Sequence, residues 1–224
     1  MNGNQQSTDL AFEAWVSHVF DQSIEDSAHY SMDEYTPEPS PVTAVQYLTR
    51  VFESADTTLD RFADEPLNQA LWEMLNDVSS NSMSALLADD VPWPVRQECI
   101  RSIGDLFERL FAERCSQHLS YKDEPEANPL NLVCYMWWDI FPTWGDPDNA
   151  SCLERDTEIL QVMQRILSLD CMACQESALH GLGHWQMHYP EQTQRMIDDY
   201  LQRHGRLRAE LKDYAMAARR GYVQ

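Results

Sequence analysis

The spacing of apolar residues constrains the fold of this chain more than any other feature. Hydrophobic side chains recur every three or four positions, as at Val45, Leu48 and Phe52, which is the period of an amphipathic helix. No segment alternates apolar and polar residues like a half-buried strand, and valine and isoleucine together number only 18 of the 224 residues. The sequence therefore predicts an all-α protein with no β-sheet.

Turn signals divide this pattern into segments. Clusters of proline, glycine, serine and asparagine separate the amphipathic runs and mark the ends of helices. At this length we expect a single domain over residues 1–224, best defined over residues 95–204. The expected helices start near Thr8 or Asp9 and then occupy residues 42–53, 66–78, 95–114, 129–141, 153–168, 173–187, 191–204 and 207–219.

Two segments are expected to lie outside the helices. Residues 1–8 are polar, and we expect them to be frayed. Residues 23–41 are acidic and contain three prolines, which is typical of a loop or of an arm laid over the surface.

Two of the predicted helices have similar sequences. Residues 95–106 read VRQECIRSIGDL and residues 174–185 read CQESALHGLGHW. Each segment has Leu or Ile directly before a glycine and a large apolar residue two positions after that glycine. The pattern resembles the second helix of a HEAT repeat, and the 79 residues between the two starts are about twice that repeat's period. The resemblance implies a right-handed, HEAT-like solenoid of α-α hairpins, in which Gly104 and Gly183 allow neighbouring helices to approach closely. The alternative is a pair of ordinary amphipathic helices.

A second resemblance carries less information. The segments NPLNLVCYMWWDIFP and CQESALHGLGHW are similar to those of a family of uncharacterised bacterial proteins. That resemblance implies a bacterial origin and no particular activity.

The charge is strongly negative and unevenly distributed. The net charge is -21, and the first 100 residues carry 18 Asp and Glu against three arginines. In contrast, residues 203–224 hold six basic residues against two acidic ones, so this tail is expected to pack on the acidic surface or to cap the helical array. The electrostatic field of a strongly negative protein repels nucleic acids and anionic membranes and attracts basic proteins. We expect a basic protein partner, and neither direct nucleic-acid binding nor membrane binding.

The acidic residues of the first helices and two tryptophans are the candidate partner-binding residues. The carboxylates fall on helices and turns, and each tryptophan lies in a proline-containing turn, where an exposed indole makes a good interface anchor. A solvated surface without a partner is the alternative. The candidates are Asp56, Asp60, Asp64, Glu65, Glu73, Asp77, Asp89, Asp90, Trp93 and Trp144.

A non-enzymatic binding module is the function that these features favour. The most concrete version is a bacterial immunity protein that neutralises a nuclease-type toxin, because such a toxin must be basic to hold its substrate. A nucleic-acid mimic is a further alternative. The chain has no nucleophile elbow, phosphate loop, H-E-x-x-H motif or dinucleotide fingerprint, so we predict no catalytic residue and no cofactor.

The pattern Cys171-x-x-Cys174 followed by His180-x-x-x-His184 is the strongest candidate for metal binding. The two histidines are one helical turn apart and can share a metal, whereas Cys171 falls on the opposite side of a continuous helix. A metal-binding protein or hydrolase centred on His180 and His184 is therefore the alternative function. His188 extends the same stripe, which would also suit a pH-sensitive surface. A dithiol redox site is disfavoured because the preceding residues, ILQVMQRILSLD, predict a helix rather than a strand.

The remaining composition indicates where the chain resides. Its first 20 residues have neither the basic start nor the continuous apolar run of a signal peptide, and no stretch of about 18 apolar residues follows. Six cysteines in a chain without a secretory signal are expected to be reduced thiols. We expect a cytoplasmic protein.

Its aromatic residues Tyr135, Trp137, Trp138 and Phe141 are expected to fill the core.

Overall fold

The computed structural model describes residues 2–21, 39–76 and 83–223, with residues 2–8 described by their backbone alone. The all-α prediction is confirmed, because these residues form helices and turns and contain no strand. Most of the predicted acidic arm at residues 23–41 and the candidate residue Asp77 lie outside the described residues.

The helices follow the predicted order, with boundaries that differ by a few residues. Pro41 and Pro190 begin their helices at the first-turn position that proline tolerates, and the Ser40 side chain accepts a hydrogen bond from the Thr43 backbone. The elements are α1 (Asn2–Phe20), α2 (Pro41–Glu53), α3 (Ala55–Thr58), α4 (Asp64–Leu75), η2 (Ser84–Leu86), α5 (Trp93–Leu106), η3 (Phe107–Phe111), α6 (Ala112–Arg114), η4 (Ser120–Lys122), α7 (Leu130–Ile140), α8 (Leu153–Leu167), α9 (Met172–Trp185), α10 (Pro190–Arg203) and α11 (Ala209–Ala218).

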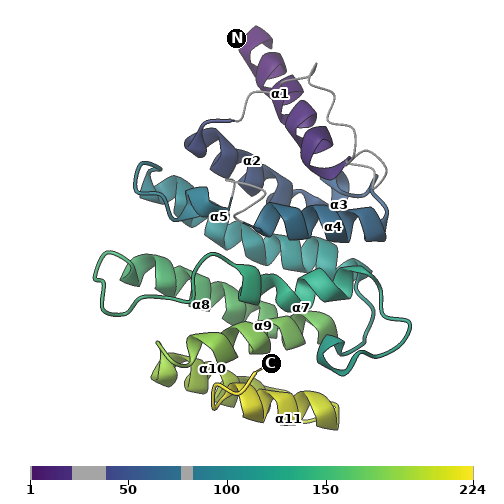
Figure 1. The fold of residues 1–224 in the computed structure, drawn as a ribbon, viewed down its shortest axis with the longest axis vertical. Helices are drawn as coiled ribbons and strands as arrows, with labels where there is room; N and C mark the ends of the chain where they lie inside the picture. The colour runs from purple at the N-terminus through teal and green to yellow at the C-terminus, as the bar shows by residue number, and fades with distance from the viewer. Residues whose placement is uncertain (1, 22–38, 77–82, 224) are drawn as a thin grey trace.

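The helices pack in two rows that run the length of the molecule. One row contains α2, α5, α8 and α10, and the other contains α1, α4, α7, α9 and α11, with each helix in contact with the next in its row. The rows meet where α8 and α10 pack on α9. Figure 1 shows the stack extending from α1 at one end to α10 and α11 at the other. One hydrophobic cluster runs through the stack from Phe12 to Ala218.

The N-terminus differs from the prediction. Residues 1–8 were expected to be frayed, but α1 begins at Asn2, about two turns before the predicted start. Once a helix is nucleated, each added residue gains a backbone hydrogen bond without needing apolar contacts of its own. The polar residues before Asp9 therefore extend the helix that Phe12, Trp15 and Val16 anchor in the core.

The two similar segments are not equivalent in the structure. The segment at 95–106 lies in α5 and the segment at 174–185 in α9, and these helices belong to different rows. The expectation that Gly104 and Gly183 each admit a neighbouring helix holds only for Gly104, which lies against a side chain of α8. Gly104 faces the flexible side chain of Arg165, and Gly183 faces Val223 near the end of the chain. The local pattern reflects a shared need for small residues at packed positions rather than the same place in a repeat.

The close contact between α7 and α9 depends instead on Gly181. A Cβ atom at this position would lie 2.6 Å from Cγ and 2.7 Å from Cβ of Trp138, closer than packed atoms approach. Trp137 and Trp138 are fully buried, as predicted for this aromatic run. The Ser177 hydroxyl of α9 donates to the backbone carbonyl of Cys134 on α7. Because both helices are held this near to each other, side chains from each meet along the contact.

We expect the substitution Gly181→Ala to destabilise the protein. The added methyl group must displace Trp138, and overpacking of this kind costs about 1–3 kcal/mol of unfolding free energy, more than the helix propensity gained. Urea denaturation measures the change. Gly205→Ala is the matched control, because nothing lies within 4 Å of a Cβ at that position. Equal stabilities for the two variants would contradict this account of the contact.

Candidate metal centre

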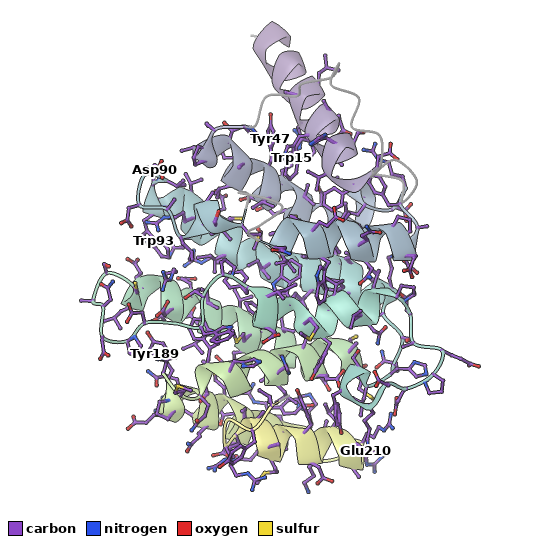
Figure 2. The ribbon with its side chains drawn as sticks, viewed as in Figure 1. Trp15, Tyr47, Asp90, Trp93, Tyr189 and Glu210 are labelled. Atoms are coloured by element: carbon purple, nitrogen blue, oxygen red, sulfur yellow. The ribbon has the colours of Figure 1, made fainter. Side chains whose placement is uncertain are left out.

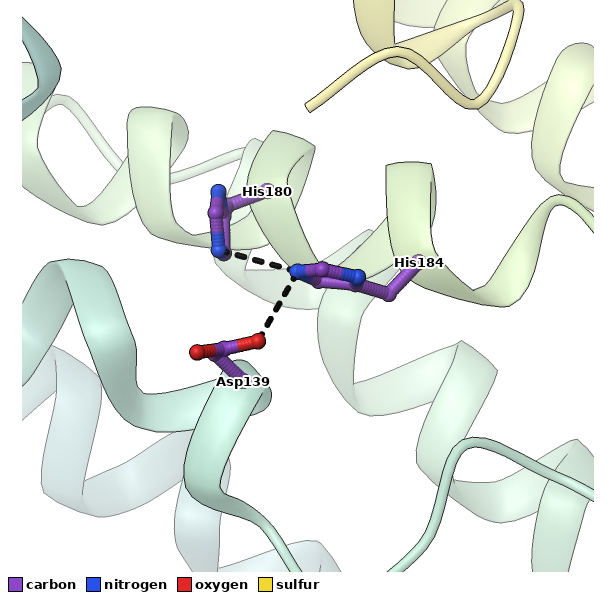
Figure 3. Close-up of side chains that lie close together, drawn as sticks. All are labelled: Asp139, His180 and His184. Atoms are coloured by element: carbon purple, nitrogen blue, oxygen red, sulfur yellow. Dashed lines mark hydrogen bonds and ion pairs between the residues drawn. The ribbon is translucent and has the colours of Figure 1, made fainter. Parts of the chain in front are cut away.

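The α7–α9 contact brings together one carboxylate and two imidazoles (Figure 3). Asp139 lies in the last turn of α7, and His180 and His184 lie one turn apart on α9. The Nε2 atom of His184 is 3.0 Å from Nε2 of His180 and 3.1 Å from Oδ1 of Asp139. One ligand atom from each residue lies within 4.8 Å of the other two. In the described part of the chain this is the one group of three or more residues that converges in this way.

Two of the three separations, those from His184 Nε2 to the other two ligand atoms, are close to the spacing of ligands on one transition-metal ion. With bonds of 2.0–2.1 Å, a tetrahedral zinc ion holds its ligand atoms about 3.3 Å apart. Without a metal, a proton on His184 Nε2 would face two acceptors, the Asp139 carboxylate and the His180 Nε2 atom. A single proton serves two acceptors poorly, whereas a cation in its place satisfies all three groups. The donor set of two imidazoles and one carboxylate fits zinc or iron(II), with coordination positions left open.

Both histidines are held in the neutral form that ligates metals. Burial lowers the pKa of His180 to about 3, and the neighbouring His184 acts in the same direction. Burial also lowers the pKa of His184, against the opposing effect of the Asp139 carboxylate. Protonated imidazole cannot bind a metal, so these shifts keep the site available across the physiological range.

A pair of hydrogen-bonded tyrosines orients His180 through its Nδ1 atom. The hydroxyl of Tyr214, on α11, is 2.6 Å from Nδ1 of His180 and 3.1 Å from the hydroxyl of Tyr135. A metal-ligating histidine usually donates its other ring N–H to such a partner, which fixes the ring and its tautomer. Here a proton on Nδ1 directed to Tyr214 leaves the Nε2 lone pair facing His184 and Asp139. Tyr214 therefore has the position of an orienting residue.

The side of the centre opposite the tyrosines is partly open to solvent. The side chains of His184 and Asp139 are 22% and 31% exposed. Trp144 stacks on the His184 ring with a centroid separation of 5.3 Å and an interplanar angle of 9°, and it remains 47% exposed. Asp139 also lies at the C-terminal, negative end of the α7 dipole, where a cation is favoured and an isolated carboxylate is not.

A buried carboxylate fixes the loop that carries Trp144. Asp156 of α8 is fully buried and accepts hydrogen bonds from the backbone N–H of Asp146 and from the hydroxyl of Tyr189, each at 2.7 Å. Gly145 adopts a φ of 90° and packs so tightly against Tyr189 that a side chain would clash there. This arrangement holds the neighbouring indole against His184.

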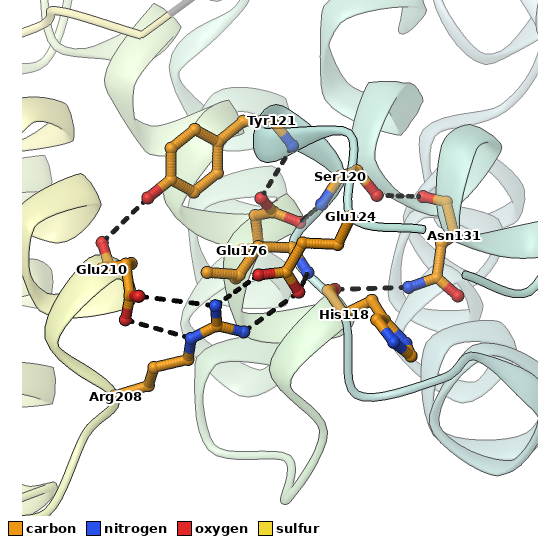
Figure 4. Close-up of polar contacts among 9 residues, drawn as sticks. His118, Ser120, Tyr121, Glu124, Asn131, Glu176, Arg208 and Glu210 are labelled. Atoms are coloured by element: carbon orange, nitrogen blue, oxygen red, sulfur yellow. Dashed lines mark hydrogen bonds and ion pairs between the residues drawn. The ribbon is translucent and has the colours of Figure 1, made fainter. Parts of the chain in front are cut away.

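A second polar network supports the tyrosines (Figure 4). Glu176 of α9 is fully buried and accepts hydrogen bonds from the backbone N–H groups of Ser120 and Tyr121 in η4. The Tyr121 ring in turn stacks on Tyr214 at a centroid distance of 4.5 Å. Arg208 pairs with Glu124 of the same loop, so part of the basic C-terminal tail packs on acidic residues as expected. Glu176 thus positions the orienting tyrosine through Tyr121.

The sequence-predicted metal residues divide into two groups in the structure. His180 and His184 meet as expected, but they are joined by Asp139, which the sequence analysis missed. Cys174 lies within α9, because the helix begins at Met172, so the two cysteines point away from the histidines. His188 is exposed and is not part of the group of ligand atoms. The only signal for Asp139 would have been the pairing of α7 with α9, which no local pattern reveals.

The predicted acidic residues are mostly exposed. Asp56 pairs with Arg109, and Asp64 pairs with Arg114 and accepts a hydrogen bond from Asn128, so these two are partly neutralised. Glu73 is half-buried and bonds to Gln69. Among the predicted acidic residues, four are exposed and have no ion pair from the described residues, namely Asp60, Glu65, Asp89 and Asp90.

The two predicted tryptophans differ in their surroundings. Trp93 is half-buried at the start of α5, with the guanidinium of Arg96 5.6 Å from its ring centroid. Figure 2 shows Trp93 near Asp90 on one edge of the stack. Trp144 belongs to the candidate metal centre instead, through its contact with His184. The structure therefore does not join the two indoles in one surface with the acidic residues of the first helices.

Comparisons with protein-family models, with curated proteins and with solved structures found no match to this chain. Within residues 2–21, 39–76 and 83–223, no helix combines the length and the apolar character needed to cross a membrane.

We expect Glu176 to make stability depend on pH. Burial raises the pKa of this carboxyl to about 7, although the two backbone N–H groups oppose the shift. The folded state therefore binds the proton more strongly than the unfolded state, and stability falls as pH rises from about 4.5 to about 7, by roughly 3 kcal/mol. Glu176→Gln should remove this pH-dependent contribution to the free energy of unfolding.

Urea unfolding of both proteins at pH 5 and pH 8 measures the difference between their pH dependences. Glu191→Gln, at an exposed carboxylate of α10, is the matched control. Parallel pH profiles for the wild type and Glu176→Gln would refute the expected contribution of Glu176.

Proposed function

We propose that this protein binds a divalent transition-metal ion through Asp139, His180 and His184. The observation that supports the proposal most directly is the convergence of one carboxylate oxygen and two imidazole nitrogens, with His180 held by Tyr214 and His184 stacked on Trp144. The neutral state of both histidines and the position of Asp139 at a helix C-terminus favour a cation at the same point.

Three protein ligands are typical of a catalytic metal centre rather than a structural one. A structural zinc site is closed by four protein ligands, whereas a catalytic site keeps a position for water or substrate. A zinc-bound water ionises near neutral pH and supplies a nucleophile for hydrolysis. The partly exposed side of the centre beside Trp144 is where a substrate would approach. Hydrolysis is therefore the reaction class that we propose to test first.

Zinc content measured by mass spectrometry of the purified protein tests the proposal. We expect His184→Ala to lose one equivalent of zinc relative to the wild type. Tyr214→Phe should keep the site but weaken its zinc affinity by about 10–100-fold, because His180 loses its orienting partner. His188→Ala is the matched control, since His188 is an exposed histidine outside the group. A His184→Ala protein with as much zinc as the wild type would rule out this site.

A second candidate function is the capture of a basic protein by the acidic surface. The exposed carboxylates of Asp60, Glu65, Asp89 and Asp90, without ion pairs from the described residues, favour it. The concrete version is a cytoplasmic bacterial immunity protein that neutralises a basic, nuclease-type toxin. Two rows of alternating helices support a HEAT-like solenoid as its scaffold, because such stacks present long surfaces to partners.

Affinity capture from bacterial lysate, followed by a salt titration, tests this second candidate. We expect a basic partner whose affinity falls as ionic strength rises. A variant with Asp60→Asn, Glu65→Gln, Asp89→Asn and Asp90→Asn should lose that partner. The control neutralises four other exposed carboxylates, with Glu113→Gln, Glu154→Gln, Asp170→Asn and Glu191→Gln. Equal capture by both variants would show that total charge, and not this surface, recruits the partner.

A further inference from the structure

Trp144 is an exposed aromatic residue in direct contact with the candidate metal centre. Its indole stacks on the imidazole of His184, with an interplanar angle of 9° and a centroid separation of 5.3 Å, and the residue is 47% exposed. Rings that overlap fully lie closer together than this, so the indole is offset from the imidazole and part of its surface extends beyond it. Because His184 covers part of one ring face, the accessible part lies on the remaining face and edges. An aromatic surface is therefore open to solvent beside the metal ligands.

The loop that carries Trp144 packs directly on the end of α9. A Cβ atom at Gly145 would lie 2.6 Å from Cε2 of Tyr189 and 3.0 Å from Cζ3 of Trp185, and both of these aromatic side chains are buried. The backbone N–H of Asp146 donates to a buried carboxylate of α8, which holds the loop from its other side. These contacts fix the indole before a ligand binds, so little conformational entropy is lost on binding.

The charge of the same loop restricts which groups can lie over the indole. Asp146 and Asp148 are both exposed, and neither has an ion pair with another described residue. Arg155, which follows the loop in α8, is paired with the buried Asp156, so its charge is already balanced. The loop is therefore anionic, and an uncharged or cationic group is favoured over an anionic one beside it.

We propose that Trp144 determines the specificity of the centre, and that its substrate carries a planar aromatic ring, uncharged or cationic, close to the bond that is hydrolysed. This inference rests on the proposed function, because the metal holds the reacting group while Trp144 holds the ring. Offset stacking on an indole favours a flat π-system over a saturated ring of similar size, and a cationic ring adds cation–π attraction. An ion bound about 2.0 Å from Nε2 of His184 lies within about 9 Å of the indole centroid, which a short alkyl linker spans.

Hydroxamic acids test the inference by binding alone, because the hydroxamate group coordinates zinc and needs no reaction. Isothermal titration calorimetry of the zinc-loaded wild type compares phenylpropanohydroxamic acid with cyclohexylpropanohydroxamic acid, which share the linker and the metal-binding group. We expect the phenyl compound to bind about 3–10-fold more tightly, although the cyclohexyl ring is the more apolar of the two. Equal affinities, or tighter binding of the cyclohexyl compound, would overturn the inference.

Charged derivatives of the phenyl compound test the electrostatic part of the inference. An aminomethyl group at the para position of the ring should strengthen binding, and a carboxyl group at the same position should weaken it. The difference between the two affinities should shrink as ionic strength rises, because salt screens the carboxylates of the loop. Tighter binding of the carboxyl derivative would show that the ring does not lie beside Asp146 and Asp148.

Variants of Trp144 separate this inference from the proposed function. Trp144→Ala should abolish the preference for the phenyl compound and keep the zinc, because the indole is not a ligand, whereas Trp144→Phe should retain part of the preference. Trp93→Ala is the matched control, since the Trp93 ring lies under the guanidinium of Arg96 rather than against the centre. A wild type that binds no zinc overturns the proposed function and this inference with it. Bound zinc together with a phenyl preference that survives Trp144→Ala overturns this inference alone.

Discussion

The close approach of α7 and α9 is the constraint on which the proposed metal centre depends. Gly181 allows α9 to lie against Trp138, and no larger residue fits there without displacing the indole. All three proposed metal ligands lie on these two helices. One packing contact thus brings the carboxylate of α7 to the imidazoles of α9. Because packed interiors tolerate little change in volume, the spacing of the ligands is set by this contact.

Buried carboxylates outside the metal centre hold its surroundings in place. Glu176 binds the backbone of η4 and thereby supports Tyr121 and Tyr214, while Asp156 binds the loop that carries Trp144. Burying these groups costs free energy unless their hydrogen bonds are made, and both have partners here. Such networks place polar side chains more exactly than apolar packing alone, which is what a metal centre requires.

Local sequence patterns predicted the elements well and the three-dimensional site poorly. The apolar periodicity predicted the helices from Pro41 to Ala218 within a few residues, because amphipathic spacing is a local property. The repeat-like segments did not predict the pairing of helices, since α5 and α9, which contain them, belong to different rows. His180 and His184 were recognisable because they are one turn apart on one helix. Asp139 was not, because it joins the site only through the contact between two helices distant in sequence.

A crystal of the protein grown with zinc would test the central claim most directly. An anomalous difference map recorded at the zinc absorption edge should show a peak about 2.0–2.2 Å from Oδ1 of Asp139 and from Nε2 of His180 and His184. A map with no peak there, and with the two imidazoles joined by a direct hydrogen bond, would contradict the claim that α7 and α9 together form a metal centre.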